Sequence, residues 1–197
     1  MNFLVNKIVC AIGCVAKDNN SKLNAKHIAF AAMAVALAVV TSMIKVIKLP
    51  MGGSVTLFSM LFIVLIGYWY GIKTGLAAAL AYGVLQLLLD PYILNIPQVL
   101  LDYILGFGAL GLSGIFSNSK HGLIKGYIVG VIGRFICSFL SGWIFFAVYT
   151  PEFFNSAILY SIVYNGSYIG LEAAVTLVVI SLPAVNKALA YVKNNLV

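Results

Sequence analysis

The chain has few charged residues. Only 9% of its 197 residues are Asp, Glu, Lys or Arg, whereas 62% are apolar. An average soluble domain has about 25% charged residues. Uncharged stretches recur at lengths that suit a hydrocarbon layer roughly 30 Å thick, which a helix of about 20 residues crosses. They do not alternate between apolar and polar residues as membrane β-strands do. We therefore expect an all-α integral membrane protein.

Catalytic and metal-binding side chains are also scarce. The chain has three cysteines and two histidines, and His27 and His121 both fall at the borders of apolar runs. A serine protease needs a serine facing a histidine. An aspartyl protease needs two aspartates within the membrane, and this chain offers only Asp102. Cys10 and Cys14 are one helical turn apart, but a metal site needs more ligands than their surroundings supply. We expect no enzyme, no bound metal and no cofactor.

Six apolar runs are long enough to be drawn as membrane-spanning helices. Lys73 marks a tight turn between the second and the third, and Pro97 suits the first turn of the fourth. The last run exceeds one crossing, and Pro183 is expected to end or kink it. The six spans cover about 27–44, 55–70, 74–89, 97–116, 126–149 and 155–185.

The lysine positions predict how these spans are oriented. With the N-terminus inside, the outer loops hold only Lys45 and Lys48, and nine lysines fall on the cytoplasmic side. Positive charge favours the cytoplasmic side, so both termini are expected there, and the net charge of +7 indicates orientation rather than nucleic-acid binding. We expect a cytoplasmic or interfacial extension at 1–24 and a six-helix membrane domain at 25–197. The nine lysines are Lys7, Lys17, Lys22, Lys26, Lys73, Lys120, Lys125, Lys187 and Lys193.

Asp102 is a carboxylate inside an apolar helix, which is costly in lipid and marks a functional site by default. At a rise of about 1.5 Å per residue, Asp102 and the adjacent Tyr103 lie about two turns below the outer surface. Three other segments deliver polar and aromatic side chains to the same half of the membrane. These side chains are Tyr92, Ser138, Phe146, Tyr160 and Asn165.

Together, these residue types suit a flat, cationic, heteroaromatic ligand. A carboxylate neutralises positive charge or accepts a hydrogen bond from an exocyclic amine, and aromatic rings stack on flat ligands and attract cations. Asn165 offers both a donor and an acceptor to a ring edge. Taken alone, Tyr103 and Tyr160 also fit the aromatic belt at the membrane surface, and Asn165 a hydrogen bond between helices. Convergence around one carboxylate favours a binding site.

Other charged, polar and small residues are assigned mainly to structure. Arg134 and Glu172 fall at the same depth in spans five and six, about 24 Å below the outer surface, and are expected to form an ion pair. Gln86 and Gln98 are expected to form hydrogen bonds between helices. A row of alanines on span one serves either packing within the bundle or docking of another membrane protein. The row consists of Ala25, Ala29, Ala32 and Ala36.

Four stretches stand in the order and spacing of a known family: GGSVTLFSM at 52–60, QVLLDYILGFGALGLSG at 98–114, GRFICSFLSGWIFF at 133–146 and LYSIVYNGSY at 159–168. With them the chain resembles the thiamine-specific substrate-binding (S) components of energy-coupling factor (ECF) transporters, the ThiT or YuaJ family. The resemblance covers nearly the whole chain from span one onward. The first 20 or so residues lie outside it.

The resemblance implies a six-helix bundle in a bacterial plasma membrane. It also implies a buried thiamine pocket near the outer surface, capped by the loop after span one. The family's pocket positions agree with those chosen from depth and add one glycine in span five. They fall on Tyr92, Asp102, Tyr103, Gly142, Phe146, Tyr160 and Asn165.

The chain departs from this family at two positions of the expected pocket. The family commonly has a ligand-contacting histidine where this chain has Ser138, and some members have a tryptophan near Gly53 in the capping loop. A serine does not stack on a ring. Trp143 or another ring would have to compensate.

The resemblance implies capture of thiamine from outside by a binding subunit. Release inside then requires a transmembrane coupling subunit, docked on the first helix at Ala29, Ala32 and Ala36, together with two ATPases. The 197 residues contain no G-x-x-x-x-G-K-[ST] phosphate loop with which to use ATP directly. A self-sufficient secondary transporter of a cationic heteroaromatic solute is an alternative, although no inverted repeat is visible. A second alternative is that the ligand is a thiamine precursor.

Overall fold

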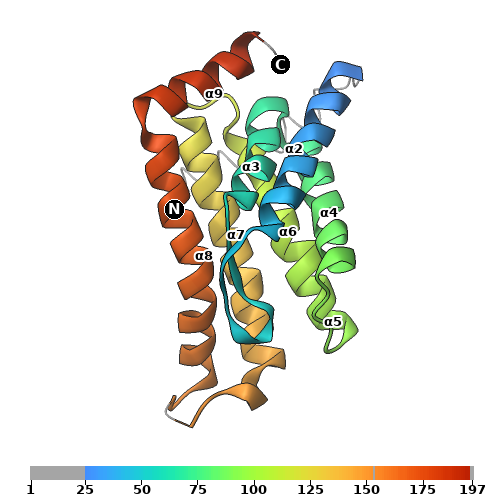
Figure 1. The fold of residues 1–197 in the computed structure, drawn as a ribbon, viewed down its shortest axis with the longest axis vertical. Coiled ribbons are helices and arrows are strands. Elements are labelled where there is room, and N and C mark those ends of the chain that lie inside the picture. The colour runs from blue at the N-terminus through green and yellow to red at the C-terminus, as the bar shows by residue number, and fades with distance from the viewer. Residues whose placement is uncertain (1–24, 153, 196–197) are drawn as a thin grey trace, which may run out of the picture.

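Long apolar helices pack side by side in a bundle (Figure 1). The computed structural model describes residues 25–152 and 154–195. Four segments have the length and hydropathy to cross a membrane: α4 (Ile72–Leu89), the composite segment Ile96–Phe116, α7 (Gly122–Phe145) and α8 (Ala157–Ser181). Two further apolar helices, α2 (Ala25–Met43) and α3 (Ser59–Tyr70), pack against them. A mostly helical membrane protein is confirmed, and the six crossings and the orientation of the termini stay predictions.

The composite segment changes its winding along its length. It consists of α5 (Ile96–Val99), the π-helical turn η2 (Leu100–Leu105), α6 (Gly106–Gly108) and the 3-10 stretch η3 (Ala109–Phe116). Asn95 caps α5, because its side-chain oxygen accepts a hydrogen bond from the first turn of the helix. π-Helical turns are rare in proteins, and those that occur are often found at functional sites. Asp102 lies on η2.

The connection between α2 and α3 is a β-hairpin. β1 (Lys45–Lys48) pairs antiparallel with β2 (Ser54–Thr56) around the short 3-10 turn η1 (Pro50–Gly52). Met51 in this turn has a φ of 59°, in the left-handed region through which tight turns reverse the chain. The sequence predicts that the second membrane-spanning helix begins near Val55. This start is wrong, because Val55 lies in β2, which pairs with β1, and the helix begins only at Ser59.

Glycines let neighbouring helices of the bundle approach closely. A Cβ on Gly111 of η3 would lie 2.7 Å from the carbonyl oxygen of Gly75 on α4. A Cβ on Gly75 would in turn lie 2.7 Å from the Cα of Gly67 on α3. On α7, a Cβ at Gly126 would lie 2.8 Å from the carbonyl oxygen of Ser113. Small residues that allow such contacts are typical of packed membrane helices.

The last helix, α9 (Pro183–Asn195), turns away from α8 and lies across one end of the bundle (Figure 1). α8 stops at Ser181, so the prediction that Pro183 ends or kinks this run is confirmed. Lys193 fixes α9 to the bundle. Its Nζ donates a hydrogen bond to Ser117 O and lies 4.0 Å from the centre of the Tyr68 ring. Burial in this contact lowers the pKa of Lys193.

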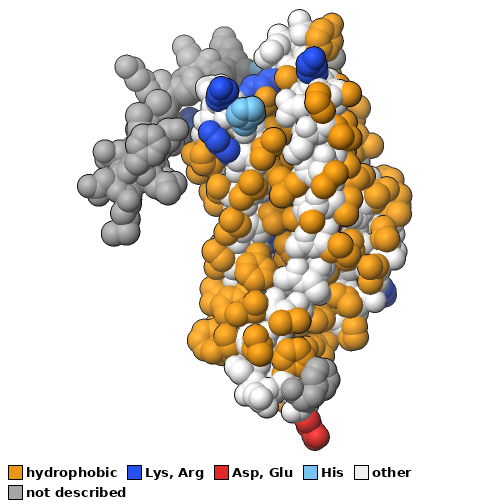
Figure 2. Space-filling model, turned by 90° about the vertical axis from the view of Figure 1, so that its left-hand side faces the viewer, with side chains coloured by type: hydrophobic (Ala, Val, Ile, Leu, Met, Phe, Trp, Pro, Cys, Tyr) orange, Lys and Arg blue, Asp and Glu red, His pale blue; other side chains and the backbone are white. Residues whose placement is uncertain are grey.

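The surface separates charge from apolar area. Figure 2 shows basic side chains gathered at one end of the molecule, an apolar band along its length, and an acidic side chain at the opposite tip. The start of α2 and the whole of α9 lie at the same end of the bundle (Figure 1). This places both ends of the described chain on one side, and which side faces the cytoplasm stays a prediction. The extension expected at 1–24, with Cys10 and Cys14, lies outside the described residues.

Candidate functional site

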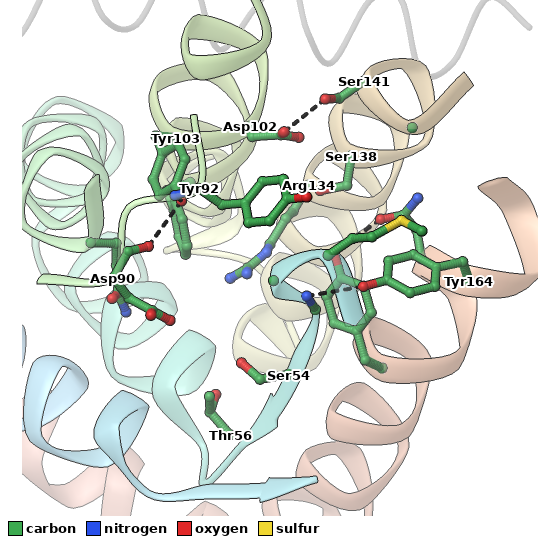
Figure 3. A pocket seen from close by; sticks show the side chains of 18 of the residues that line it. Ser54, Thr56, Asp90, Tyr92, Asp102, Tyr103, Arg134, Ser138, Ser141 and Tyr164 are labelled. Carbon is green, nitrogen blue, oxygen red and sulfur yellow. Dashed lines mark hydrogen bonds between the residues drawn. The ribbon is translucent and has the colours of Figure 1, made fainter. Parts of the chain in front are cut away.

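A cavity of about 140 Å³ lies in the half of the bundle away from α9 (Figure 3). The hairpin, the C-terminal end of α4, η2, α7 and α8 all contribute to its wall. Within the described ranges, no three His, Cys, Asp or Glu side chains converge on a possible metal position. All eight residues expected to bind the ligand line this cavity, and their contact with a ligand stays a prediction. They are Tyr92, Asp102, Tyr103, Ser138, Gly142, Phe146, Tyr160 and Asn165.

Asp102 faces the cavity from η2 and is held through one of its two oxygens. Ser141 Oγ donates to Asp102 Oδ2 at 2.7 Å (Figure 3). Gln98 Nε2 donates to the same atom at 2.7 Å. Among the described residues, no side chain or amide donates to Oδ1. A carboxylate has about four acceptor positions, so Asp102 retains capacity to accept hydrogen bonds from a ligand.

Gln98 orients this carboxylate and is itself held by the link before α5. Its Oε1 accepts from Leu94 N at 3.1 Å, its Nε2 also donates to Tyr92 O at 3.2 Å, and the side chain is 1% exposed. The prediction that Gln98 joins two helices is wrong, because these partners belong to its own segment and the adjoining link. Gln86 likewise bonds within one helix, donating to Tyr82 one turn earlier on α4.

Tyr103 fixes the shape of the link that carries Tyr92. The Tyr103 hydroxyl accepts a hydrogen bond from Tyr92 N at 2.8 Å and donates one to Asp90 O at 3.0 Å. The Tyr92 ring then stacks on Phe146, with centroids 5.7 Å apart and planes at 27°. Tyr103 therefore holds a pair of stacked rings in the cavity wall. Flat ligands and cations bind favourably against such rings.

α8 presents a row of tyrosines to the cavity. Tyr160, Tyr164 and Tyr168 have consecutive ring centroids 5.8 Å apart. The sequence argument selects only Tyr160 from this row. The spacing of four residues in LYSIVYNGSY is a signal that finds the other two, because residues i, i+4 and i+8 share one face of a helix.

Asn165 is less available to a ligand than the sequence indicates. Its Nδ2 donates to Ser161 O at 3.0 Å, its Oδ1 accepts from the Tyr168 hydroxyl at 2.9 Å, and it is only 5% exposed. Gly142 on α7 packs directly against this group. A Cβ there would lie 2.3 Å from Ser161 Oγ and 2.9 Å from Asn165 Nδ2. Glycine is therefore needed where α7 and α8 meet.

Ser138 is buried in the cavity wall and contributes no ring. Trp143 does not compensate for it, because its side chain is 42% exposed, stacks on Phe139 with centroids 6.2 Å apart, and is not part of the cavity wall. The structure brings four additional rings into this wall, those of Tyr82, Phe107, Tyr164 and Tyr168.

The β-hairpin covers one side of the cavity and is tied to its neighbours. Gly53 N donates to the Tyr164 hydroxyl at 3.0 Å, and that hydroxyl donates to Pro50 O (Figure 3). A Cβ on Gly53 would lie 2.6 Å from the same hydroxyl oxygen. On the other side of the hairpin, Lys45 forms an ion pair with Asp90 at the end of α4. These contacts join the hairpin to α8 and to α4.

The ion pair predicted between Arg134 and Glu172 is not formed. Glu172 accepts hydrogen bonds from Thr56 N and Oγ1 at 3.1 and 2.7 Å and from Met60 N at 3.3 Å, while Arg134 lies 4.0 Å from the centre of the Phe107 ring. Among the described residues, the only ion pair within 4.0 Å is the one at the hairpin. Equal depth was an insufficient criterion, because it leaves the direction of each side chain around its helix undetermined.

The alanines of the possible docking face lie on the outside of the bundle. Ala29, Ala32 and Ala36 are exposed on α2, whereas Ala34 and Ala38 are 5% and 0% exposed and face the core. Packing within the bundle is therefore done by a different face of α2. The exposed row is free to contact lipid or another membrane protein.

Apolar helices long enough to cross a membrane, packed around a cavity lined by a carboxylate and several rings, are typical of a membrane protein that handles a small molecule. A family model described as thiamine transporter protein (Thia_YuaJ) matches residues 28–191, and the chain belongs to this family. Over 167 residues it is 32% identical to the thiamine transporter ThiT of Bacillus subtilis (strain 168), covering 76% of this chain and 85% of that protein. The fold is similar to that of ThiT from Listeria monocytogenes, with a TM-score of 0.71 and 26% identity, covering 83% of this chain and 96% of that structure.

The family assignment made from the sequence is thereby confirmed. So is the expectation of a transport protein rather than an enzyme, located in a bacterial plasma membrane with several crossings.

Proposed function

We propose that this chain is the thiamine-binding subunit of an energy-coupling factor importer. It captures thiamine from the outside in the cavity around Asp102, and a separate transmembrane coupling subunit with two ATPases drives release inside. Both termini lie in the cytoplasm in this orientation, which puts the hairpin and the cavity in the outer half of the membrane. The single observation that carries the proposal is the Asp102 carboxylate, which is fixed at Oδ2 and open at Oδ1.

The chemistry of the wall matches that of thiamine. Thiamine joins a permanently positive thiazolium ring to an aminopyrimidine ring, so it offers both a charge and an amine to a carboxylate. The stacked pair of Tyr92 and Phe146 and the tyrosine row on α8 supply ring faces, each worth about 0.5–2 kcal/mol. Asp102 supplies the opposite charge from a partly buried position, where electrostatic attraction is stronger than in bulk solvent.

The energy for transport comes from other subunits in this proposal. The sequence has no phosphate loop of its own, and the outer row of Ala29, Ala32 and Ala36 on α2 presents small side chains to a partner helix. Small residues let two helix backbones approach closely in lipid. The coupling subunit docks on this row.

The proposal is tested by titrating the purified chain in detergent with thiamine and with its aminopyrimidine precursor, using calorimetry. Thiamine is expected to bind tightly, and the precursor more weakly, because it lacks the positive ring. The role of the Asp102 carboxylate is tested with Asp102→Asn, which is expected to weaken thiamine binding. Asp90→Asn is its matched control, since Asp90 also lines the cavity but is paired with Lys45. Tighter binding of the precursor would assign the site to that compound instead.

Uptake by the chain alone separates the binding subunit from a self-sufficient transporter. Liposomes that contain only this chain are expected to bind thiamine without accumulating it inside. Accumulation driven by an ion gradient would contradict the proposed need for a coupling subunit and ATPases, and would favour secondary transport.

A further inference from the structure

Arg134 is the only arginine of the chain and lies in the middle of α7. A charge at such a position in a membrane is costly, and such residues face a bundle interior or a polar cavity. Arg134 is one of the residues that line the ligand cavity. The cavity wall thus contains a fixed positive charge that a purely cationic ligand does not need.

The guanidinium of Arg134 forms no salt bridge within 4.0 Å among the described residues. Its recorded contact is with the face of Phe107, 4.0 Å from the ring centre. Glu172 is occupied by the hydrogen bonds from the hairpin and α3, and Asp90 is paired with Lys45. Among the described residues, no hydrogen bond or ion pair from an Arg134 nitrogen is present either. Since Arg134 lines the cavity, its guanidinium can donate hydrogen bonds to an anion there.

Arg134 and Asp102 divide the cavity into two differently charged parts. Figure 3 shows the Arg134 side chain reaching away from the Asp102 carboxylate, toward the side of the cavity where Ser54 lies. No salt bridge joins the two groups within 4.0 Å in the part of the chain that the structure describes. A ligand with a positive ring at one end and an anionic group at the other would satisfy both parts.

We infer that Arg134 forms an anion subsite in the ligand cavity and that this subsite takes a phosphate monoester group, as in thiamine monophosphate. The inference rests on the proposed function and deepens it. A guanidinium is planar and donates two parallel hydrogen bonds to phosphate oxygens, which makes arginine well suited to phosphate recognition. The Phe107 ring, 4.0 Å from the guanidinium carbon, attracts the cation and helps to hold it at this position.

The test compares thiamine with thiamine monophosphate in the wild-type chain and in Arg134→Gln and Arg134→Lys. We measure the ratio of the two dissociation constants by calorimetry in detergent without added phosphate. Arg134→Gln is expected to worsen binding of the monophosphate at least about tenfold relative to thiamine, because charge-assisted hydrogen bonds are lost. Arg134→Lys keeps the positive charge but lacks the planar pair of N–H donors, and is expected to give an intermediate ratio.

Lys48→Gln is the matched control, because it removes a positive charge from the same hairpin at an exposed position that does not line the cavity. It is expected to leave the ratio within about threefold of wild type, since salt screens an exposed charge outside the cavity. Inorganic phosphate is the second probe, because it offers the same oxygens without the linked rings. If inorganic phosphate competes with thiamine monophosphate but not with thiamine, the subsite takes the phosphate group of the linked compound. If inorganic phosphate instead raises the affinity for thiamine, and does so only when Arg134 is present, the subsite takes free phosphate.

The outcomes separate this inference from the proposed function. If thiamine binds to the wild type and the ratio is unchanged in Arg134→Gln, with no effect of inorganic phosphate, the anion subsite is wrong and the thiamine site stands. If neither compound binds to the wild-type chain, both the proposed function and the subsite are wrong. Thiamine binding by each variant also shows that the variant is folded.

Discussion

Asp102 and Glu172 are both carboxylates inside apolar helices, but the protein surrounds them in different ways. Glu172 is 5% exposed and accepts from Thr56 N, Thr56 Oγ1, Ser59 Oγ and Met60 N. Asp102 is less buried, lines the cavity and accepts two hydrogen bonds, both at Oδ2. A saturated carboxylate is a structural connector, and a partly satisfied one beside a cavity is equipped to bind.

Glu172 shows why a membrane carboxylate need not be a ligand site. It joins α8 to the end of β2 and to the first turn of α3, where backbone N–H groups lack helical partners. A negative charge at a helix N-terminus is also favoured by the helix dipole. Glu172 therefore holds the base of the hairpin that covers the cavity. The comparison predicts that replacing Glu172 mainly lowers stability, whereas replacing Asp102 mainly lowers the affinity for thiamine.

The largest effect is expected from Glu172→Gln. A carboxamide offers one acceptor oxygen in place of two and introduces donors that face other donors, so stability should fall by about 3 kcal/mol. The measurement is the thermal unfolding midpoint in detergent. Glu152→Gln, at an exposed position, is the control and should leave the midpoint within a few degrees. An unchanged midpoint in Glu172→Gln would show that these hydrogen bonds do not support the fold.

Gly142→Ala is expected to have the next largest effect, because it acts on the cavity wall itself. The added methyl group would lie 2.3 Å from Ser161 Oγ, so α7 and α8 must separate, at a cost of about 1–3 kcal/mol. Thiamine affinity should fall together with the unfolding midpoint. Gly170→Ala on α8, where a Cβ meets nothing within 4 Å, is the control. Equal behaviour of the two variants would mean that close packing at Gly142 is unimportant.

The smallest effect is expected at the ion pair between Lys45 and Asp90. The two side chains are 24% and 55% exposed, and exposed ion pairs contribute about 0–1 kcal/mol. Lys45→Gln should therefore change stability little but should speed thiamine dissociation up to about fivefold, because one tie between the hairpin and α4 is lost. Stopped-flow measurement of the dissociation rate at low and high salt tests this. Salt should speed dissociation from the wild type and not from the variant.

Much of the helical scaffold is predictable from the sequence, because a hydrocarbon layer imposes length and composition on each crossing. The hairpin was not predictable in this way. Val55 is apolar and continues the run of α3, and only its pairing with Ile47 shows that it belongs to a strand. The turn at Met51 depends on backbone angles that hydropathy does not report.

The candidate site is predictable where depth and residue type suffice. Asp102 and Tyr160 reach one cavity because segments that cross a bilayer bring residues of equal depth to one level. Depth fails for Arg134 and Glu172, because it does not specify the direction in which a side chain leaves its helix. Gln98 is a local example of the same limit, since its spacing of four residues from Asp102 allows a bond within one segment.

The thiamine dissociation constant of Asp102→Asn, measured beside Asp90→Asn, tests the central claim most directly. The account predicts at least about a tenfold loss of affinity for Asp102→Asn, with an unfolding midpoint close to that of the wild type, because the ligand loses its opposite charge while Gln98 and Ser141 keep an acceptor. Asp90→Asn should change affinity much less. Unchanged affinity in Asp102→Asn would contradict the claim that this carboxylate binds the ligand.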